Sequence, residues 1–321
     1  MGKSCILAIC VPCYNEEAVL EDSATKLMLL LNSLKKEGIV SPESFILFSN
    51  DGSSDRTWDI ISTLHSQDNS FCGISLSANF GFQSNLMAAI TEARKMADYI
   101  VTIDADLQDD YKLIPQMLEY CVKDGCDVVY GVRKDRSTDS RFKRVTATTF
   151  YKFMAWMNVK TIYNHADFRL MSRRYVQALE EYPERNLYIR GIVSRMGYPS
   201  ASVYYDRTER QAGETKFTLA KMVSLAVDGI TSFSIKPMRL LLLTGLCFIV
   251  FAFCMLLYVL FSLKGASASG WPSLMLSLWF IGGVLLVGLG IMGEYIGKIY
   301  LETKGRPRYH ISRKLLKDDD H

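Results

Sequence analysis

The sequence predicts an α/β domain built on a mostly parallel sheet, followed by two membrane-spanning helices. The domain is indicated by short apolar, β-branched runs that alternate with helix-length segments through the N-terminal part of the chain. The membrane helices are indicated by two long stretches without a charged residue, 240–263 and 265–293. A third observation is that acidic and amide side chains follow directly after three of the predicted strands.

The expected elements follow one another in a regular order. The predicted strands are 6–11, 45–49, 73–76, 99–103 and 127–131. The predicted helices cover 19–34, a segment from 57, 85–97 and 111–123. Pro12 is expected to end the first strand and Gly38 the first helix. Ser54 or Asp55 is expected to cap the second helix.

Three polar loops, 14–17, 50–55 and 104–109, each follow a predicted strand. Because parallel strands end at one edge of a sheet, and ligands bind there, we expect the loops to converge. In Asp104-Ala105-Asp106-Leu107-Gln108-Asp109, two carboxylates stand one residue apart with a carboxamide behind them. Such hard oxygen ligands suit Mg²⁺ or Mn²⁺ held together with substrate phosphates. A solvated acidic loop with helix-capping aspartates is the alternative.

Several function classes are disfavoured by composition and motif. The first strand is not followed by G-x-G-x-x-G, which argues against a dinucleotide-binding site. With 37 basic and 34 acidic residues, the net charge of +3 argues against general nucleic-acid binding. The eight cysteines include one C-x-x-C pair, Cys10 and Cys13, without a second pair of metal-binding spacing. We interpret them as small apolar residues rather than zinc or redox groups.

The two uncharged stretches predict a membrane hairpin. Twenty-four helical residues in 240–263 reach about 36 Å, enough to cross a hydrocarbon core of about 30 Å. Lys236 and Arg239 precede the first span, and four basic residues between 298 and 308 follow the second. The positive-inside rule places both flanks, and with them both termini and the main domain, in the cytoplasm. No N-terminal signal peptide is expected, so the protein is predicted to be a multi-pass protein of the inner membrane.

The segment 218–237 connects the main domain to the first span. Its broad apolar surface is interrupted by Lys221, Asp228 and Lys236, which is typical of helices lying at a membrane interface. Packing against the main domain explains the same pattern equally well. The expected division is a cytoplasmic domain over 1–217, juxtamembrane helices over 218–237, a transmembrane hairpin over 238–298 and a basic tail over 299–321.

In combination, these motifs resemble the family 2 glycosyltransferases with the Rossmann-like GT-A fold, and among them the polyprenyl-phosphate glycosyltransferases. The bactoprenol glucosyltransferases and dolichyl-phosphate mannose synthase belong to that group. The resemblance extends from Val11-Pro12 through the motif 166–170 to the segment 293–300 and Arg306-Pro307. It implies transfer of one sugar, with inversion, from a nucleotide sugar to a membrane polyprenyl phosphate, assisted by Mg²⁺ or Mn²⁺.

The resemblance also implies roles for single residues. The nucleotide-sugar contacts fall on Pro12, Tyr14, Asn15, Glu16, Asp51, Asp104, Ala105, Asp106, Arg210 and Lys216. The metal ligands fall on Asp104, Asp106 and Gln108. The acceptor phosphate also needs cationic contacts, and Arg133, Arg144 and Arg169 are the candidates because arginine binds phosphate bidentately. The catalytic residues are Asp106, Asp167 and Arg210, with Asp167 positioning the acceptor and a base role left open.

Two positions depart from the family pattern, and two features keep structural alternatives. Ala166 replaces the usual glycine of the motif 166–170, and Phe82 stands where histidine or lysine is common. Asp167 could instead cap a helix, with Arg169 as its surface ion-pair partner. The loop 207–217 is expected to close over the donor, with a solvated connection as the alternative.

UDP-glucose is the favoured donor because the C-terminal segments resemble the bactoprenol group. GDP-mannose, UDP-galactose, a UDP-N-acetyl sugar and a modified arabinose remain open. The expected partners are this nucleotide sugar, undecaprenyl phosphate or a similar lipid, and the membrane, but not nucleic acid. The glycine-rich second span could pack against a second copy of the chain, or its glycines could serve only the hairpin. The product would be a lipid-linked sugar for cell-envelope glycosylation. A processive polymerase is disfavoured because Q-x-x-R-W and further spans are missing; a non-catalytic nucleotide-sugar binder is the other alternative.

Overall fold

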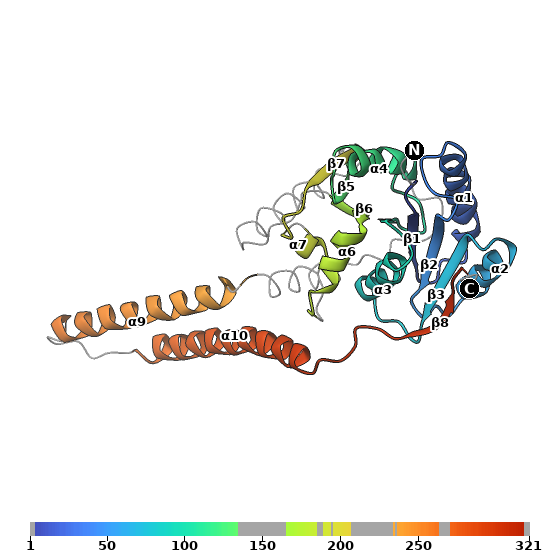
Figure 1. Ribbon diagram of the computed structural model, residues 1–321. Helices are drawn as coiled ribbons and strands as arrows, with labels where there is room; N and C mark the ends of the chain where they lie inside the picture. The colour runs from blue at the N-terminus through green and yellow to red at the C-terminus, as the bar shows by residue number, and fades with distance from the viewer. Residues whose placement is uncertain are drawn as a thin grey trace. The chain divides into compact units, whose positions relative to one another are not determined.

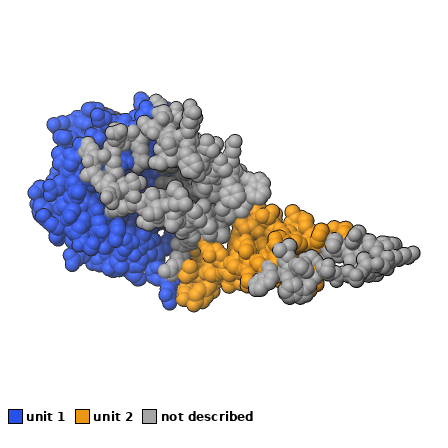
Figure 2. Space-filling model, turned by 180° about the vertical axis from the view of Figure 1, so that it is seen from behind, with its two compact units in different colours: residues 1–151, 160–218, 306–321 blue, residues 152–159, 219–305 orange. Residues whose placement is uncertain are grey.

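The computed structural model describes residues 4–133, 165–184, 189–193, 195–206, 234, 236–262 and 270–317. The chain divides into two compact units, coloured separately in Figure 2. The first comprises residues 1–151, 160–218 and 306–321, and the second comprises residues 152–159 and 219–305.

A twisted sheet forms the centre of the first unit (Figure 1), and in the described residues it has eight strands in the order β7-β5-β6-β4-β1-β2-β3-β8. The strands are β1 (Leu7–Cys13), β2 (Phe45–Asn50), β3 (Phe71–Leu76), β4 (Tyr99–Thr102), β5 (Val128–Arg133), β6 (His165–Ser172), β7 (Ser200–Tyr205) and β8 (Ile311–Leu315). β1 to β4 run parallel to their neighbours in that group, and β5 runs parallel to β7. β6 is antiparallel to β4 and β5, and β8 is antiparallel to β3. The expected α/β fold with a mostly parallel sheet is confirmed.

Helices cover both faces of this sheet. They are α1 (Leu20–Lys36), α2 (Thr57–Gln67), α3 (Phe82–Arg94), the 3₁₀ turn η1 (Tyr111–Leu113), α4 (Ile114–Lys123), α6 (Arg173–Glu180) and α7 (Ile189–Val193). Alternate residues of a strand point to opposite faces. Leu7, Ile9 and Val11 accordingly belong to a buried cluster with α1, α2 and α4. On the opposite face, the thiol of Cys10 lies 3.7 Å from the carbonyl oxygen of Ala89 in α3.

The loop-to-helix transitions are close to those expected. The N-cap residue of α2 is Arg56, without a capping bond from its side chain, so the predicted cap at Ser54 or Asp55 is wrong. Asp55 precedes the cap, and its Oδ1 accepts a hydrogen bond of 3.0 Å from the amide of Thr57. Ser54 does not cap this helix; its own amide donates to Asn15 Oδ1 at 2.9 Å. The predicted helix 111–123 begins as the tighter turn η1, which the side chain of Asp110 caps through the amide of Lys112.

The prediction that Pro12 ends the first strand is wrong, since β1 continues to Cys13 and pairs with β2 through Cys13↔Asn50. The carbonyl oxygen of Cys10 accepts a hydrogen bond from the amide of Ile103, on the side of the strand that faces β4. The backbone nitrogen of Pro12, two residues later, faces the same side. Pairing with β4 has already ended at Cys10↔Thr102. The missing amide proton of Pro12 therefore costs no ladder hydrogen bond.

Three strands, β6, β7 and β8, were not predicted from the sequence. The most distant of them in the chain is β8, which follows the second long helix and pairs with β3 at the sheet edge (Figure 1). Its sequence, Ile-Ser-Arg-Lys-Leu, is polar and its middle residues are exposed, as suits an edge strand. Residues 311–315 of the expected basic tail are thus part of the sheet.

The second unit contains two long helices, α9 (Lys236–Ser262) and α10 (Trp271–Thr303). They contact each other through the rings of Phe248 and Phe280, whose centroids lie 5.6 Å apart edge to face. Within the described residues, one helical stretch, Phe280–Thr303, is long and apolar enough to cross a membrane. Several α9 side chains lie outside the described residues, so the pair of spans stays a prediction. The expected interfacial helices also fall outside, apart from Ser234 and the start of α9.

Candidate active site

The loops after β1 and β2 meet at the carboxyl edge of the sheet. Asn15 adopts a left-handed backbone conformation with φ 54°. Its Oδ1 accepts a hydrogen bond of 2.9 Å from the amide of Ser54, and its own amide donates to Ser53 Oγ at 3.0 Å. The amide of Glu16 donates to Thr57 Oγ1 at 3.0 Å. These bonds fix the loop 14–17 against the loop 50–55, as the sequence predicts.

Asp51 holds a third loop in place. Its carboxylate is buried, and Oδ1 accepts a hydrogen bond of 2.8 Å from the amide of Phe80 while Oδ2 accepts one of 3.0 Å from the amide of Gly81. Burial raises the pKa of Asp51, and the two amide bonds act in the opposite direction. Each oxygen keeps a second lone pair, which leaves the predicted nucleotide contact open to this residue.

Gly52 is expected to be intolerant of a side chain. It has φ +62°, and a Cβ atom there would lie 2.5 Å from the carbonyl carbon of Ala78. Gly52→Ala should lower the free energy of unfolding by more than the roughly 1–2 kcal/mol of the left-handed conformation alone, because backbone atoms must move. Gly38→Ala is the matched control, since Gly38 has φ +70° and open space around it. Thermal unfolding of both variants measures the difference, and equal losses would contradict the predicted steric conflict.

The acidic loop after β4 is anchored to its surroundings. Ser23 of α1 donates a hydrogen bond of 2.6 Å to the carbonyl oxygen of Ala105. Leu107 has φ 45°, and the loop closes through a bond of 3.1 Å from its amide to the carbonyl oxygen of Asp104. The tight turn sets Asp104 and Asp106 on a fixed backbone.

Asp104 lies among other carboxylates. Loss of hydration is the largest cause that raises its pKa, to about 7, although the residue is partly exposed at the surface. The negative charges that add to the shift are those of Asp109, Asp167 and Asp106, in that order. Arg133 acts in the opposite direction. Four acidic side chains, three from the loop and one from β6, therefore gather at the end of β4.

This donor set fits a hard divalent cation. Carboxylate and carboxamide oxygens are the ligands that Mg²⁺ and Mn²⁺ prefer, and a bound cation would favour the charged form of Asp104. Among the described residues, His, Cys, Asp and Glu side chains do not form a group of three or more arranged as a metal cage. Binding through one or two carboxylates completed by substrate phosphates is the usual arrangement for Mg²⁺. Asp104 and Asp106 match that arrangement, and the buried Gln108 lies next to them in the chain.

A buried cluster supports this loop from behind. Asp109 Oδ1 accepts hydrogen bonds from Arg133 Nη2 at 2.8 Å and from the Tyr205 hydroxyl at 2.7 Å. Asp109 Oδ2 is buried without a hydrogen-bond partner in the described part of the chain. Arg133 thus neutralises an acid of the site, and its side chain is 29% exposed. Its predicted contact with the acceptor phosphate stays a prediction.

Asp167 and Arg169 lie in β6, so the alternative of a helix cap with a surface partner is wrong. The two residues share one face of the strand, opposite the core residues Phe168 and Leu170. Arg169 is fully buried, and its Nη2 lies 2.5 Å from Asp167 Oδ1. Its Nε and Nη1 atoms have no hydrogen-bond partner among the described residues. Thr102, the last residue of β4, donates a hydrogen bond of 2.5 Å to the carbonyl oxygen of Asp167, which joins the backbone at this acid to the end of β4.

Comparison with known families gives a match: the glycosyl transferase family 2 model matches residues 8–180. The chain belongs to glycosyl transferase family 2. The uncharacterized glycosyltransferase YkoT of Bacillus subtilis (strain 168) is 46% identical over 98% of this chain and 93% of its own length. A prophage bactoprenol glucosyl transferase homolog of Escherichia coli (strain K12) is 40% identical over 96% and 98%. The bactoprenol glucosyl transferase of Shigella phage SfX is also 40% identical, over 96% and 99%.

Solved structures show weaker likeness to this family 2 glycosyltransferase. One is the glucosyl-3-phosphoglycerate synthase of Mycobacterium tuberculosis in complex with Mn²⁺, UDP and phosphoglyceric acid. It is 17% identical, covers 71% of this chain and 76% of its own, and has a TM-score of 0.45. The family membership confirms the resemblance inferred from the sequence, and the protein is a glycosyltransferase with a mostly parallel α/β fold.

The remaining predicted residues of the glycosyltransferase site divide into two groups. Tyr14, 42% exposed, follows β1 directly, and Pro12 and Glu16 flank it in the chain. Arg144, Arg210 and Lys216 lie outside the described residues, as does the loop 207–217. Sequence reasoning did not identify Tyr205 or the amides that bind Asp51. No local pattern could have indicated them, because each acts on a residue far away in the sequence.

Proposed function

We propose that the protein transfers glucose from UDP-glucose to the phosphate of a membrane polyprenyl phosphate, such as undecaprenyl phosphate, with inversion and with the help of Mg²⁺ or Mn²⁺. The observation that carries this proposal is the gathering of Asp104, Asp106 and Asp167 at the end of β4. The near full-length similarity to proteins named bactoprenol glucosyl transferase supports glucose and a lipid acceptor.

Asp104, Asp106 and Gln108 would hold the cation against the donor diphosphate. When bound there, the cation would supply Lewis-acid stabilisation to the leaving diphosphate. Asp109 and Arg133 keep the acidic loop in place through their ion pair. Arg210 and Lys216 are proposed to add positive charge where the diphosphate leaves. Tyr14, Asn15, Glu16 and Asp51 are proposed to surround the nucleotide.

The acceptor is a phosphate monoester whose second pKa is about 6, so it is mostly a dianion at neutral pH. One of its oxygens attacks the anomeric carbon as the bond from that carbon to the diphosphate breaks, which releases UDP. A strong general base is not needed. Asp167, held by the buried Arg169, is proposed to orient the acceptor, and Arg133 and Arg144 to bind its phosphate.

A lipid acceptor requires an active site near the bilayer. We propose that α9 and α10 both cross the cytoplasmic membrane, with the catalytic domain over 1–217 on the cytoplasmic side. The apolar stretch Phe280–Thr303 supports the second crossing. The long lipid tail could then stay in the membrane while its phosphate reacts.

A transfer assay tests the proposal directly. Purified full-length protein, undecaprenyl phosphate and Mn²⁺ or Mg²⁺ are incubated with radiolabelled UDP-glucose, UDP-galactose, UDP-N-acetylglucosamine or GDP-mannose. We expect label in the lipid extract with UDP-glucose alone, and its loss when a chelator is added. Lipid-linked product from another donor would replace glucose in the proposal. Nucleotide-sugar binding without product from any donor would refute transfer to this acceptor.

A further inference from the structure

The segment 306–317, here called the C-terminal segment, follows α10 in the chain and belongs to the first unit. Its strand β8 pairs with β3 through Ile74↔Lys314 and Ser75↔Arg313. Ser312 Oγ also donates a hydrogen bond of 3.0 Å to the carbonyl oxygen of Ser75. β3 lies next to β2, and the loop after β2 carries Asp51. The C-terminal segment therefore pairs with the strand adjacent to the one that leads to the proposed nucleotide site.

The contact continues beyond the strand into the loop that follows β3. The amide of Ser77 donates a hydrogen bond of 2.9 Å to the carbonyl oxygen of His310. The imidazole of His310 meets the ring of Phe80 edge to face, with centroids 6.2 Å apart. Phe80 and Gly81 are the residues whose amides bind the carboxylate of Asp51. His310 is therefore two contacts away from Asp51.

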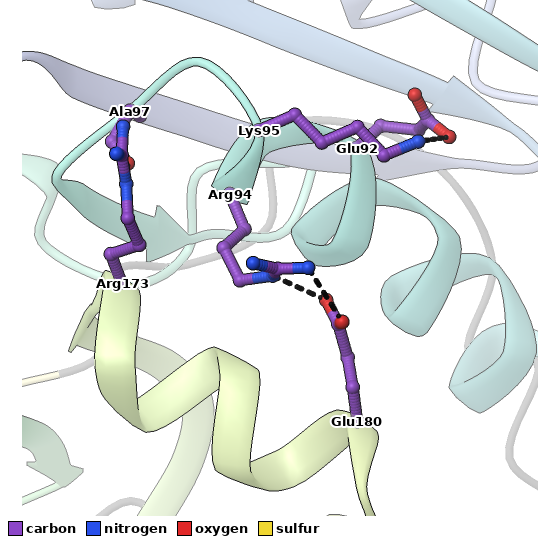
Figure 3. A network of polar contacts seen from close by, with 6 residues as sticks. All are labelled: Glu92, Arg94, Lys95, Ala97, Arg173 and Glu180. Carbon is purple, nitrogen blue, oxygen red and sulfur yellow. Dashed lines mark hydrogen bonds and ion pairs between the residues drawn. The ribbon is translucent and has the colours of Figure 1, made fainter.

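The helix that begins after this loop is held by the same segment. Lys314 Nζ lies 3.0 Å from Glu92 Oε1 in α3, and Lys95 lies 2.7 Å from the same oxygen. Figure 3 shows the Glu92–Lys95 pair together with the two hydrogen bonds that Arg94 donates to Glu180 of α6. The end of α3 is thus held by the C-terminal segment and by α6. The loop before α3 contacts His310 through Phe80 and Asp51 through the amides of Phe80 and Gly81.

We propose that the C-terminal segment positions the loop 79–81 and, through it, Asp51, so that nucleotide binding depends on residues that follow the second long helix. His310 is the positioning residue. The inference rests on the proposed function, which places the nucleotide at Asp51. An edge-to-face contact is modest in strength, so its loss should weaken rather than abolish binding.

The test compares three variants of the full-length protein in detergent. UDP affinity in the presence of Mn²⁺ is measured by calorimetry, and hydrogen exchange reports on the amides of Phe80 and Gly81. His310→Ala should weaken UDP binding about three- to tenfold, accelerate exchange at both amides and leave kcat at saturating donor unchanged. His310→Phe keeps an aromatic edge and should restore both properties. Lys317→Ala removes a contact to the carbonyl oxygen of Glu43, away from the loop, and should change neither.

The inference is overturned if His310→Ala keeps wild-type affinity and exchange, or if His310→Phe fails to restore them. It is also overturned if affinity falls only in proportion to the folded fraction measured by thermal unfolding. Asp51→Asn separates the two proposals. If this variant loses UDP binding while His310→Ala does not, the positioning role alone fails. If Asp51→Asn binds UDP as the wild type does, the proposed nucleotide site itself is wrong.

Discussion

Replacing Asp104 with asparagine is expected to reduce sugar transfer on the order of a thousandfold or more, effectively to the detection limit. Asparagine has the same shape but no charge, so the cation site loses one of its two carboxylates. Lewis-acid stabilisation is worth several kcal/mol, and each 1.4 kcal/mol corresponds to a factor of about ten in rate. The transfer assay measures kcat, and a titration with Mn²⁺ measures the loss of metal affinity independently of turnover.

The matched control is Glu119→Gln, which removes an acid from the exposed surface of α4 where it pairs with Lys123. That variant should transfer sugar at the wild-type rate, because exposed pairs within a helix contribute little. Asp104→Asn should also unfold close to the wild-type temperature, since it relieves repulsion among neighbouring acids. Retained activity in a folded Asp104→Asn protein would remove the metal role from this residue.

Replacing Arg169 with alanine is expected to lower the free energy of unfolding by about 3–5 kcal/mol, because the partner acid stays buried without its counter-charge. The side chain of Arg169 is fully buried and that of Asp167 is 7% exposed, on β6, an inner strand of the sheet. Thermal unfolding should show a fall in Tm of about 6–20 °C, at about 2–4 °C for each kcal/mol in a domain of this size.

Arg94→Ala provides the comparison, since Arg94 and Glu180 form an ion pair with side chains 25% and 24% exposed. Partial exposure lets water solvate the remaining acid, so we expect a loss of about 1 kcal/mol or less. Similar losses in the two variants would mean that burial does not set the cost of breaking the Arg169 pair. The double variant Asp167→Asn, Arg169→Met should recover most of the stability while remaining inactive.

The parallel half of the sheet was predictable because its signals are local. Each of β1 to β4 is a short apolar run followed by a polar loop, and the alternation with helices fixes the parallel direction. The acidic loop and its partners at 14–17 and 50–55 were predictable for the same reason. The prediction for Pro12 was wrong because a proline interrupts a strand only where its backbone nitrogen faces a paired neighbouring strand. Sequence alone does not show that the pairing of β1 with β4 ends before Pro12.

The rest of the site depends on contacts between residues far apart in the chain. Asp167 resembles a surface acid by sequence, and its burial follows only from the insertion of β6 between β4 and β5. The partners of Asp51 are backbone amides, which carry no residue-specific signal. Ile311–Leu315 is a polar segment that forms a strand because the β3 edge is available to it. Arg144, Arg210 and Lys216 remain predictions outside the described residues.

The position of β8 also has a consequence for biosynthesis. The ribosome makes β3 well before β8, and both long helices are synthesised between them. Throughout that interval the outer edge of β3 presents unpaired amides and carbonyls, the feature through which sheets join other chains. The sheet of a nascent chain therefore stays open on one side while both long helices are made. Closure must wait until the ribosome has released the segment beyond α10, so the sheet is the last part of the first unit to be completed.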